Sequence, residues 1–91
     1  QKLLKTTFNH WEENEKKIEE RLQNWELERI SLIDKIILVI AISELDSFPF
    51  TASRIIINEY VEVSKVFGTD KSNVFVNGIL DKYSKDTNRV N

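Results

Sequence analysis

The sequence predicts an all-α protein: a compact bundle of about five helices around one buried central helix. Only two glycines and one proline occur in 91 residues, and this scarcity disfavours a turn-rich β-sandwich or barrel. Apolar residues recur at three- and four-residue steps along most of the chain, as they do on one face of a helix. Residues 36–42 are apolar on every side, which is typical of a helix buried at the centre of a bundle.

Two amphipathic helices are expected in the first third of the chain. Residues 2–12 form the first, and Phe8 and Trp11 are expected to anchor its apolar face. The second covers about 15–24 and is capped by Asn14. Its apolar face consists of Ile18, Leu22 and Trp25. The opposite face, rich in Glu and Lys, is expected to be solvated.

The central helix is expected to begin at Ser31. Ser31 and Asp34 have the spacing of a capping box, in which a hydroxyl and a carboxylate satisfy each other's backbone N–H groups. A buried strand is the competing interpretation of the run that follows, because β-branched residues favour strands. The length of the segment, from Ser31 to about Asp46, favours a helix.

Two more helices complete the predicted bundle. Thr51 is expected to cap a helix over about 52–67, and Gly68 ends it where a left-handed residue is favoured. Its apolar stripe is Ile57, Tyr60, Val61, Ser64 and Phe67. Ser72 is expected to cap the last helix. Its buried stripe is Val76, Ile79, Leu80 and Tyr83. Residues 86–91 are expected to form a frayed tail.

The composition disfavours several classes of function. The chain has no cysteine and one histidine, and it contains no phosphate-binding glycine loop, metalloprotease motif or calcium loop. We therefore expect no enzymatic activity, no metal and no cofactor. A net charge of −2 is not typical of a general nucleic-acid binder, so an RNA contact requires a local basic patch or a partner. No segment has the length of a membrane span and no signal peptide is visible, so a cytoplasmic location is expected.

Polar and small residues in the last two helices are candidates for special roles. Asn58 and Glu59 are either ordinary surface residues or a buried polar clasp between two helices. Gly78 lies inside a helix, where glycine costs roughly 1 kcal/mol relative to alanine. We expect the close approach of another helix to offset that cost. Asn77 either bonds a neighbouring loop or faces a ligand.

Phe75 lies at the edge of the buried stripe of the last helix, close to Lys71 and Ser72 at its start. An accessible aromatic ring, a lysine and free backbone N–H groups suit stacking and phosphate contacts with single-stranded RNA. The alternative is that Phe75 belongs to the periphery of the core.

At this point the residues resemble a known family. The segments that carry the resemblance are Asn24-Trp25, Glu28-Arg29-Ile30, Ile33-Asp34-Lys35, Ile37-Leu38, Glu44-Leu45, Ile57-Asn58-Glu59, Val61-Glu62, Lys65, Phe67-Gly68 and Phe75-Val76-Asn77-Gly78-Ile79-Leu80-Asp81-Lys82. Together they cover about two thirds of the chain and are similar to the pattern of NusB-type transcription antitermination factors. The last segment is the most specific of them.

The resemblance implies an all-helical fold and a role in transcription regulation through processive antitermination. NusB-type factors pair with NusE, which is also a ribosomal protein, and the pair binds the single-stranded boxA element of RNA within the elongation complex. Transferred position by position, the resemblance places Asp34 on the partner-facing surface. It places the following residues near the RNA: Lys71, Ser72, Phe75, Asn77 and Lys82.

The chain also departs from the family pattern. The N-terminal half of the family domain, with its basic arm, is absent, and the sequence begins at Gln1, so 1–91 is expected to be a single helical domain from a longer chain. Ala52 stands where proline is common, Val74 where a basic residue is frequent, and Leu22 where some members carry an aromatic residue.

Two other functions remain open from the sequence. One is the NusB-like RNA-binding domain that precedes ribosomal-RNA cytosine methyltransferases, although the sequence Gly78-Ile79-Leu80-Asp81 differs from the ending of those domains. The other is a helical bundle that forms a homodimer or docks on a protein without binding RNA. The acidic balance of the chain supports this third interpretation.

Overall fold

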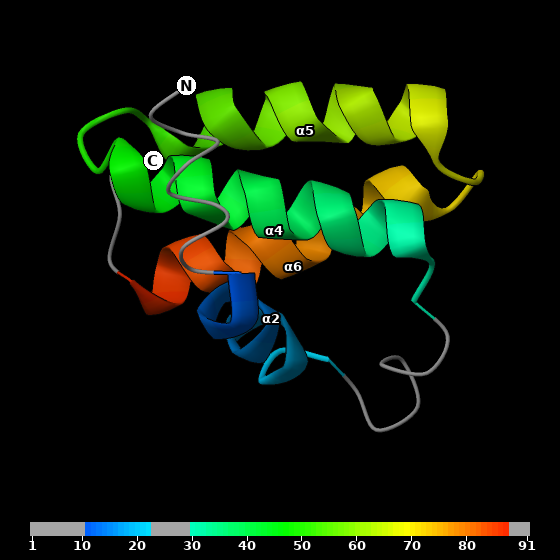
Figure 1. Cartoon of the computed structure of the whole chain (residues 1–91). Coiled ribbons are helices and arrows are strands. Elements are labelled where there is room, and N and C mark those ends of the chain that lie inside the picture. Colours follow the sequence, from blue (N-terminus) through cyan, green and yellow to red (C-terminus); the bar gives the residue numbers. More distant parts are fainter. Residues whose placement is uncertain (1–10, 23–29, 88–91) are drawn as a thin grey trace.

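The computed structural model describes residues 11–22 and 30–87. These residues form four helices and no strand: α2 (Trp11–Glu19), α4 (Leu32–Ser47), α5 (Ser53–Phe67) and α6 (Ser72–Asp86) (Figure 1). The all-α prediction is confirmed, with four helices here rather than about five. The helix predicted over 2–12 lies outside the described residues, except that Trp11 and Glu12 begin α2.

Helix α4 is the centre of the bundle. Helices α2, α5 and α6 all pack against it, and Figure 1 shows it running between α5 and α6. The side chains of Leu38, Val39 and Ile42 are completely buried. A helix surrounded by others has no face to turn to water, which is why its sequence is apolar all round. The predicted central helix is therefore confirmed.

Local hydrogen bonding explains where α4 begins. The Ser31 hydroxyl accepts a hydrogen bond from the Asp34 backbone N–H at 3.1 Å, and Ser31 itself has extended backbone angles. This contact satisfies one of the free N–H groups at the start of a helix. The prediction that Ser31 caps the helix is confirmed, and the helix ends at Ser47, close to the predicted end.

Helix α2 differs from its prediction at both ends. Asn14 lies inside the helix rather than at its cap, with 1% of its surface exposed. Its side-chain amide donates a hydrogen bond to the backbone carbonyl of Val39 in α4 at 3.3 Å. The cap prediction was wrong because a contact with a distant helix holds this side chain. Ile18 is buried as predicted, but the helix ends at Glu19 rather than near residue 24.

Helix α5 begins after Ala52, and no side chain caps it, so the prediction that Thr51 is the cap was wrong. Its inner face contains the predicted Ile57 and also Ile56. Phe67 was predicted to share this face but is 67% exposed. It is the last residue of the helix, and we attribute its exposure to the chain turning away from the core immediately afterwards.

The turn between α5 and α6 requires a glycine for a reason other than the predicted one. Gly68 has a φ of −96°, so it is not left-handed. A Cβ atom at this position would lie 2.4 Å from the Ser72 Oγ and 2.7 Å from the Ser64 carbonyl oxygen. Ser72 is the first residue of α6 and not its cap, because its hydroxyl accepts a hydrogen bond from the Thr69 N–H at 2.8 Å.

Helix α6 buries the predicted stripe against α4 and α5. The buried residues are Val76, Ile79, Leu80 and Tyr83. At its C-terminal end, the Thr87 hydroxyl donates to the Tyr83 carbonyl oxygen at 2.9 Å. Asp86 is still helical. The rest of the predicted frayed tail, residues 88–91, lies outside the described residues.

Candidate functional site

Three of the residues that the resemblance placed near RNA lie along one line that begins at Lys71, the cap residue of α6, and continues along the helix. Lys71, Phe75 and Lys82 follow each other at steps of four and seven residues, and Gly78 falls between the last two. At about 100° per residue, the four positions lie within an arc of about 60° around the helix axis. We call these four residues the α6 stripe. Lys71, Gly78 and Lys82 are exposed.

Phe75 sits at the border of the core. It packs against the core cluster and is half-buried, so the residue is neither fully in the interior nor fully exposed. The structure thus combines the two alternatives considered for this residue. An aromatic side chain held on one side by the core has little rotamer freedom left to lose on binding, which favours its use as a fixed contact surface.

Ser72 and Asn77 do not join the stripe. Ser72 is 1% exposed, and its hydroxyl is occupied by Thr69. Asn77 is exposed, but it lies about 100° around the helix from Gly78. Position on the helix therefore separates the residues that the resemblance had grouped.

The two lysines of the α6 stripe are uncompensated cations. Neither Lys71 nor Lys82 forms an ion pair with any of the residues that the structure describes. By contrast, Lys85 is 3.1 Å from Asp81 on the same helix. A lysine without a carboxylate neighbour keeps its full attraction for a phosphate, whereas a paired one must exchange partners.

Gly78 has no packing partner among residues 11–22 and 30–87. A Cβ atom built at this position meets no atom within 4 Å, and the residue is exposed. The prediction that another helix approaches it closely was wrong. The helix carries the cost of a mid-helix glycine without an offsetting contact in the described chain.

The remaining predicted residues lie elsewhere. Asp34, at the start of α4, is 8% exposed, and its Oδ1 has no hydrogen-bond partner among residues 11–22 and 30–87. Figure 1 shows the start of α4 at the same end of the bundle as the start of α6. Asn58 and Glu59 are both exposed. They form no buried clasp, so of the two alternatives the structure agrees with ordinary surface residues.

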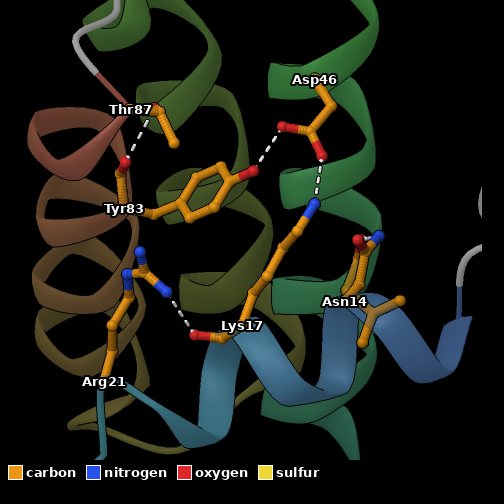
Figure 2. A network of polar contacts seen from close by, with 7 residues as sticks. Asn14, Lys17, Arg21, Asp46, Tyr83 and Thr87 are labelled. Atoms are coloured by element: carbon orange, nitrogen blue, oxygen red, sulfur yellow. Dashed lines mark hydrogen bonds and ion pairs between the residues drawn. The ribbon is translucent and has the colours of Figure 1, made fainter.

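A polar network that the sequence did not reveal joins α2 to the other helices (Figure 2). The Asp46 carboxylate of α4 forms an ion pair with Lys17 of α2 at 2.8 Å and accepts a hydrogen bond from the Tyr83 hydroxyl of α6. Arg21 lies over the Tyr83 ring, 4.9 Å from its centroid, and pairs with Asp86 at 3.0 Å. These partners are far apart in sequence, so no local pattern could have identified them.

The network shifts the protonation of two of its members. Burial and the hydrogen bond to Asp46 raise the pKa of Tyr83 to about 12. Burial alone lowers the pKa of Lys17, but the hydrogen bond and negative charge of Asp46 outweigh it, so that the pKa rises above its usual value. Near neutral pH, Lys17 is therefore charged and Tyr83 is neutral. The network is a structural clasp that joins α2, α4 and α6.

Neither a metal-binding cluster nor a membrane-spanning helix occurs among residues 11–22 and 30–87. No group of three or more His, Cys, Asp or Glu residues that could hold a metal ion occurs in the described ranges. Within the same part of the chain, none of the helices is long and apolar enough to cross a membrane.

The described residues define a class of protein, a small all-helical bundle. Comparison with known proteins identifies the family. The sequence model of the NusB family matches residues 1–85. The chain belongs to the NusB family.

Similar proteins agree with this assignment. The transcription antitermination protein NusB of Lysinibacillus sphaericus is 38% identical over 93% of this chain, and that of Methylacidiphilum infernorum is 41% identical over 94%. The solved structure of T. maritima NusB has a TM-score of 0.86 and 30% identity over 93% of this chain. The chain covers 67% and 60% of the two relatives and 60% of the T. maritima protein, so it spans about two thirds of their length.

Proposed function

We propose that the chain is a non-catalytic transcription antitermination module that binds boxA-type single-stranded RNA together with the ribosomal protein NusE. Membership of the NusB family supports the general role, because the relatives are named transcription antitermination proteins. The observation that carries the RNA contact is the α6 stripe, where two lysines without an ion pair in the described ranges flank the half-buried Phe75. The role requires no cofactor and places the module in the cytoplasm within the elongation complex.

The charge of the chain favours shared binding of the RNA. The net charge is −2, so the whole surface does not attract a polyanion. Two lysines neutralise few phosphates, and affinity for RNA backbones grows with the number of phosphates neutralised. A partner that supplies further cations completes the site. This is the physical reason why we couple RNA binding to NusE.

Asp34 is the candidate contact for the protein partner. A buried carboxylate oxygen without a hydrogen bond is costly, and a donor from another protein would satisfy it. The helix cap does not compete for this side chain, since Ser31 binds the backbone N–H of Asp34 and not its carboxylate.

The RNA contact is tested by measuring the affinity for a boxA-like RNA in the presence of NusE. Lys71→Ala and Phe75→Ala should each weaken binding about threefold to tenfold, while the helicity measured by circular dichroism is retained. Lys65→Ala is the matched control, because Lys65 is an exposed lysine already paired with Glu62. Equal losses of helicity and affinity in Phe75→Ala would show that Phe75 acts only as core.

The partner contact is tested separately by titrating NusE without RNA. Asp34→Asn keeps the size of the side chain and the Ser31 cap, and it should weaken NusE binding. Asp34→Lys should weaken it further. Unchanged NusE affinity with intact helicity in both variants would remove Asp34 from the interface.

A protein-docking bundle that never contacts RNA is the second candidate function. The exposed apolar side chains at the junction of α5 and α6 support it, since such surfaces mark protein contacts. These side chains are Val66, Phe67 and Val74. This alternative would be favoured if the chain binds NusE but does not change the affinity of NusE for RNA. Self-association of the chain into a homodimer would also favour it.

A further inference from the structure

We infer that the RNA strand runs along the α6 stripe and that its sugar–phosphate backbone crosses the helix at Gly78, where no side chain separates the two backbones. The inference rests on the proposed function and names the path of the RNA on the surface. In this arrangement Gly78 is the point at which the RNA backbone and the helix come closest. No contact inside the described chain accounts for a glycine at this position.

The glycine itself is the first argument. Glycine in the middle of a helix is unfavourable relative to alanine, since it gains backbone freedom on unfolding and buries nothing when folded. At Gly68, a short distance away, contacts with Ser72 and Ser64 leave no room for a Cβ atom. At Gly78 a side chain would extend into open space. The need for glycine at this position therefore lies outside the described chain.

The position of Gly78 on the stripe is the second argument. With a rise of about 1.5 Å per residue, Lys71 and Lys82 are about 16 Å apart along the helix axis. Gly78 lies between them, and Phe75 lies one turn before it. An extended strand that meets a lysine at each end and the edge of the Phe75 ring must pass over Gly78. A side chain there would lift the strand away from the helix.

The charges around the stripe are the third argument. Lys71 and Lys82 have no ion pair within the described ranges, whereas Asp81 is neutralised by Lys85. Asp81 is also displaced around the axis, by about 60° from Gly78, the nearest residue of the stripe. No unpaired carboxylate from α6 therefore lies on the path of the strand, and the line fits a polyanion better than an acidic peptide.

The test separates the stability of the helix from its affinity for RNA. Gly78→Ala and Gly78→Leu introduce good helix formers into open space, so both should raise the midpoint of thermal unfolding, by roughly 4–8 °C for alanine. If RNA crosses at Gly78, the affinity of the chain with NusE for boxA-like RNA should fall about threefold for alanine and about tenfold or more for leucine. Stability and affinity would move in opposite directions.

Ile55→Ala is the matched control. It also replaces an exposed residue by a better helix former, but it lies on α5, away from the stripe. It should leave RNA affinity unchanged. RNA binding by the unmodified chain with no loss in Gly78→Leu would overturn the inference and leave the proposed function standing. Absence of RNA binding by the unmodified chain with NusE would overturn both.

Discussion

Lys17 of α2 and Asp46 of α4 are 29 residues apart in sequence and form an ion pair of 2.8 Å. The same carboxylate accepts the hydroxyl hydrogen bond of Tyr83, so one side chain ties three helices together (Figure 2). Helix α2 has 9 residues, and Ile18 is its only apolar side chain in the fully buried core among the described residues. Its attachment therefore depends on these polar contacts as well as on Ile18 and the half-buried Trp11.

Removing the Asp46 carboxylate should loosen this attachment. Asp46→Ala leaves the buried Tyr83 hydroxyl without its acceptor, and we expect the free energy of unfolding in urea to fall by about 1–2 kcal/mol. The partly exposed pair with Lys17 adds less, because water screens it. Asp81→Ala removes a more exposed carboxylate that also pairs with a lysine, and should change stability by less than about 0.5 kcal/mol. Equal effects of the two substitutions would contradict the role of the network.

The raised pKa of Tyr83 predicts a loss of stability in alkali. An unfolded tyrosine titrates near pH 10, whereas Tyr83 in the folded chain titrates near 12. Between these values the folded chain holds a proton that the unfolded chain has lost, so stability falls as the pH rises. The raised pKa of Lys17 acts in the same direction. Urea unfolding between pH 9 and 12 measures the slope.

Tyr83→Phe provides the control for this pH dependence. It removes the ionising group while leaving the ring in the core, so stability should fall less steeply above pH 10. An identical slope in the substituted chain would show that Tyr83 does not contribute to it.

Gly68→Ala should have the opposite effect on stability to that expected for Gly78→Ala. The added methyl group would meet the Ser72 side chain and the Ser64 carbonyl at less than 3 Å, so the turn must shift. We expect a loss of about 1–3 kcal/mol, the usual range for overpacking. Thermal unfolding of the two variants side by side measures the contrast. A gain in stability for Gly68→Ala would contradict the close approach.

The central position of α4 predicts a strong asymmetry between two leucines of the same helix. Leu38 is completely buried and Leu32 is 70% exposed. Leu38→Ala should cost about 2–5 kcal/mol, because it leaves a cavity. Leu32→Ala should change the free energy of unfolding by less than about 0.5 kcal/mol. Similar effects in urea unfolding would show that α4 is not the centre of the core.

Local features of the sequence predicted the fold well. The Ser31 cap is a contact between residues three positions apart, and the apolar run of α4 reports its environment directly. The buried face of α6, with Val76, Ile79, Leu80 and Tyr83, follows from helical periodicity alone. In each case the physical cause lies within a few residues, where a sequence pattern can show it.

The features that sequence analysis missed depend on distant partners or on open space. Asn14 was predicted to be a cap, because the sequence could not reveal its hydrogen bond to Val39, which is 25 residues away. Phe67 has the periodicity of the inner face, but periodicity does not show where the neighbouring helices end. Gly78 was predicted to pack closely, since composition cannot show that a glycine inside a helix faces open space.

The candidate RNA site was foreseen only in part. The resemblance supplied Lys71, Phe75 and Lys82, and the structure shows that they share one line on α6. The resemblance could not show that the Ser72 hydroxyl already accepts a hydrogen bond inside the turn. Nor could it show which lysines already pair with carboxylates, because ion pairing depends on side-chain geometry.

The most direct test of the central claim is a salt titration of binding to boxA-like single-stranded RNA, with and without NusE. We predict binding that requires NusE and weakens steeply as salt increases, with a shallower slope for the double variant Lys71→Ala, Lys82→Ala. NusE binding with no RNA signal at any salt concentration would contradict the claim and identify a protein-docking bundle.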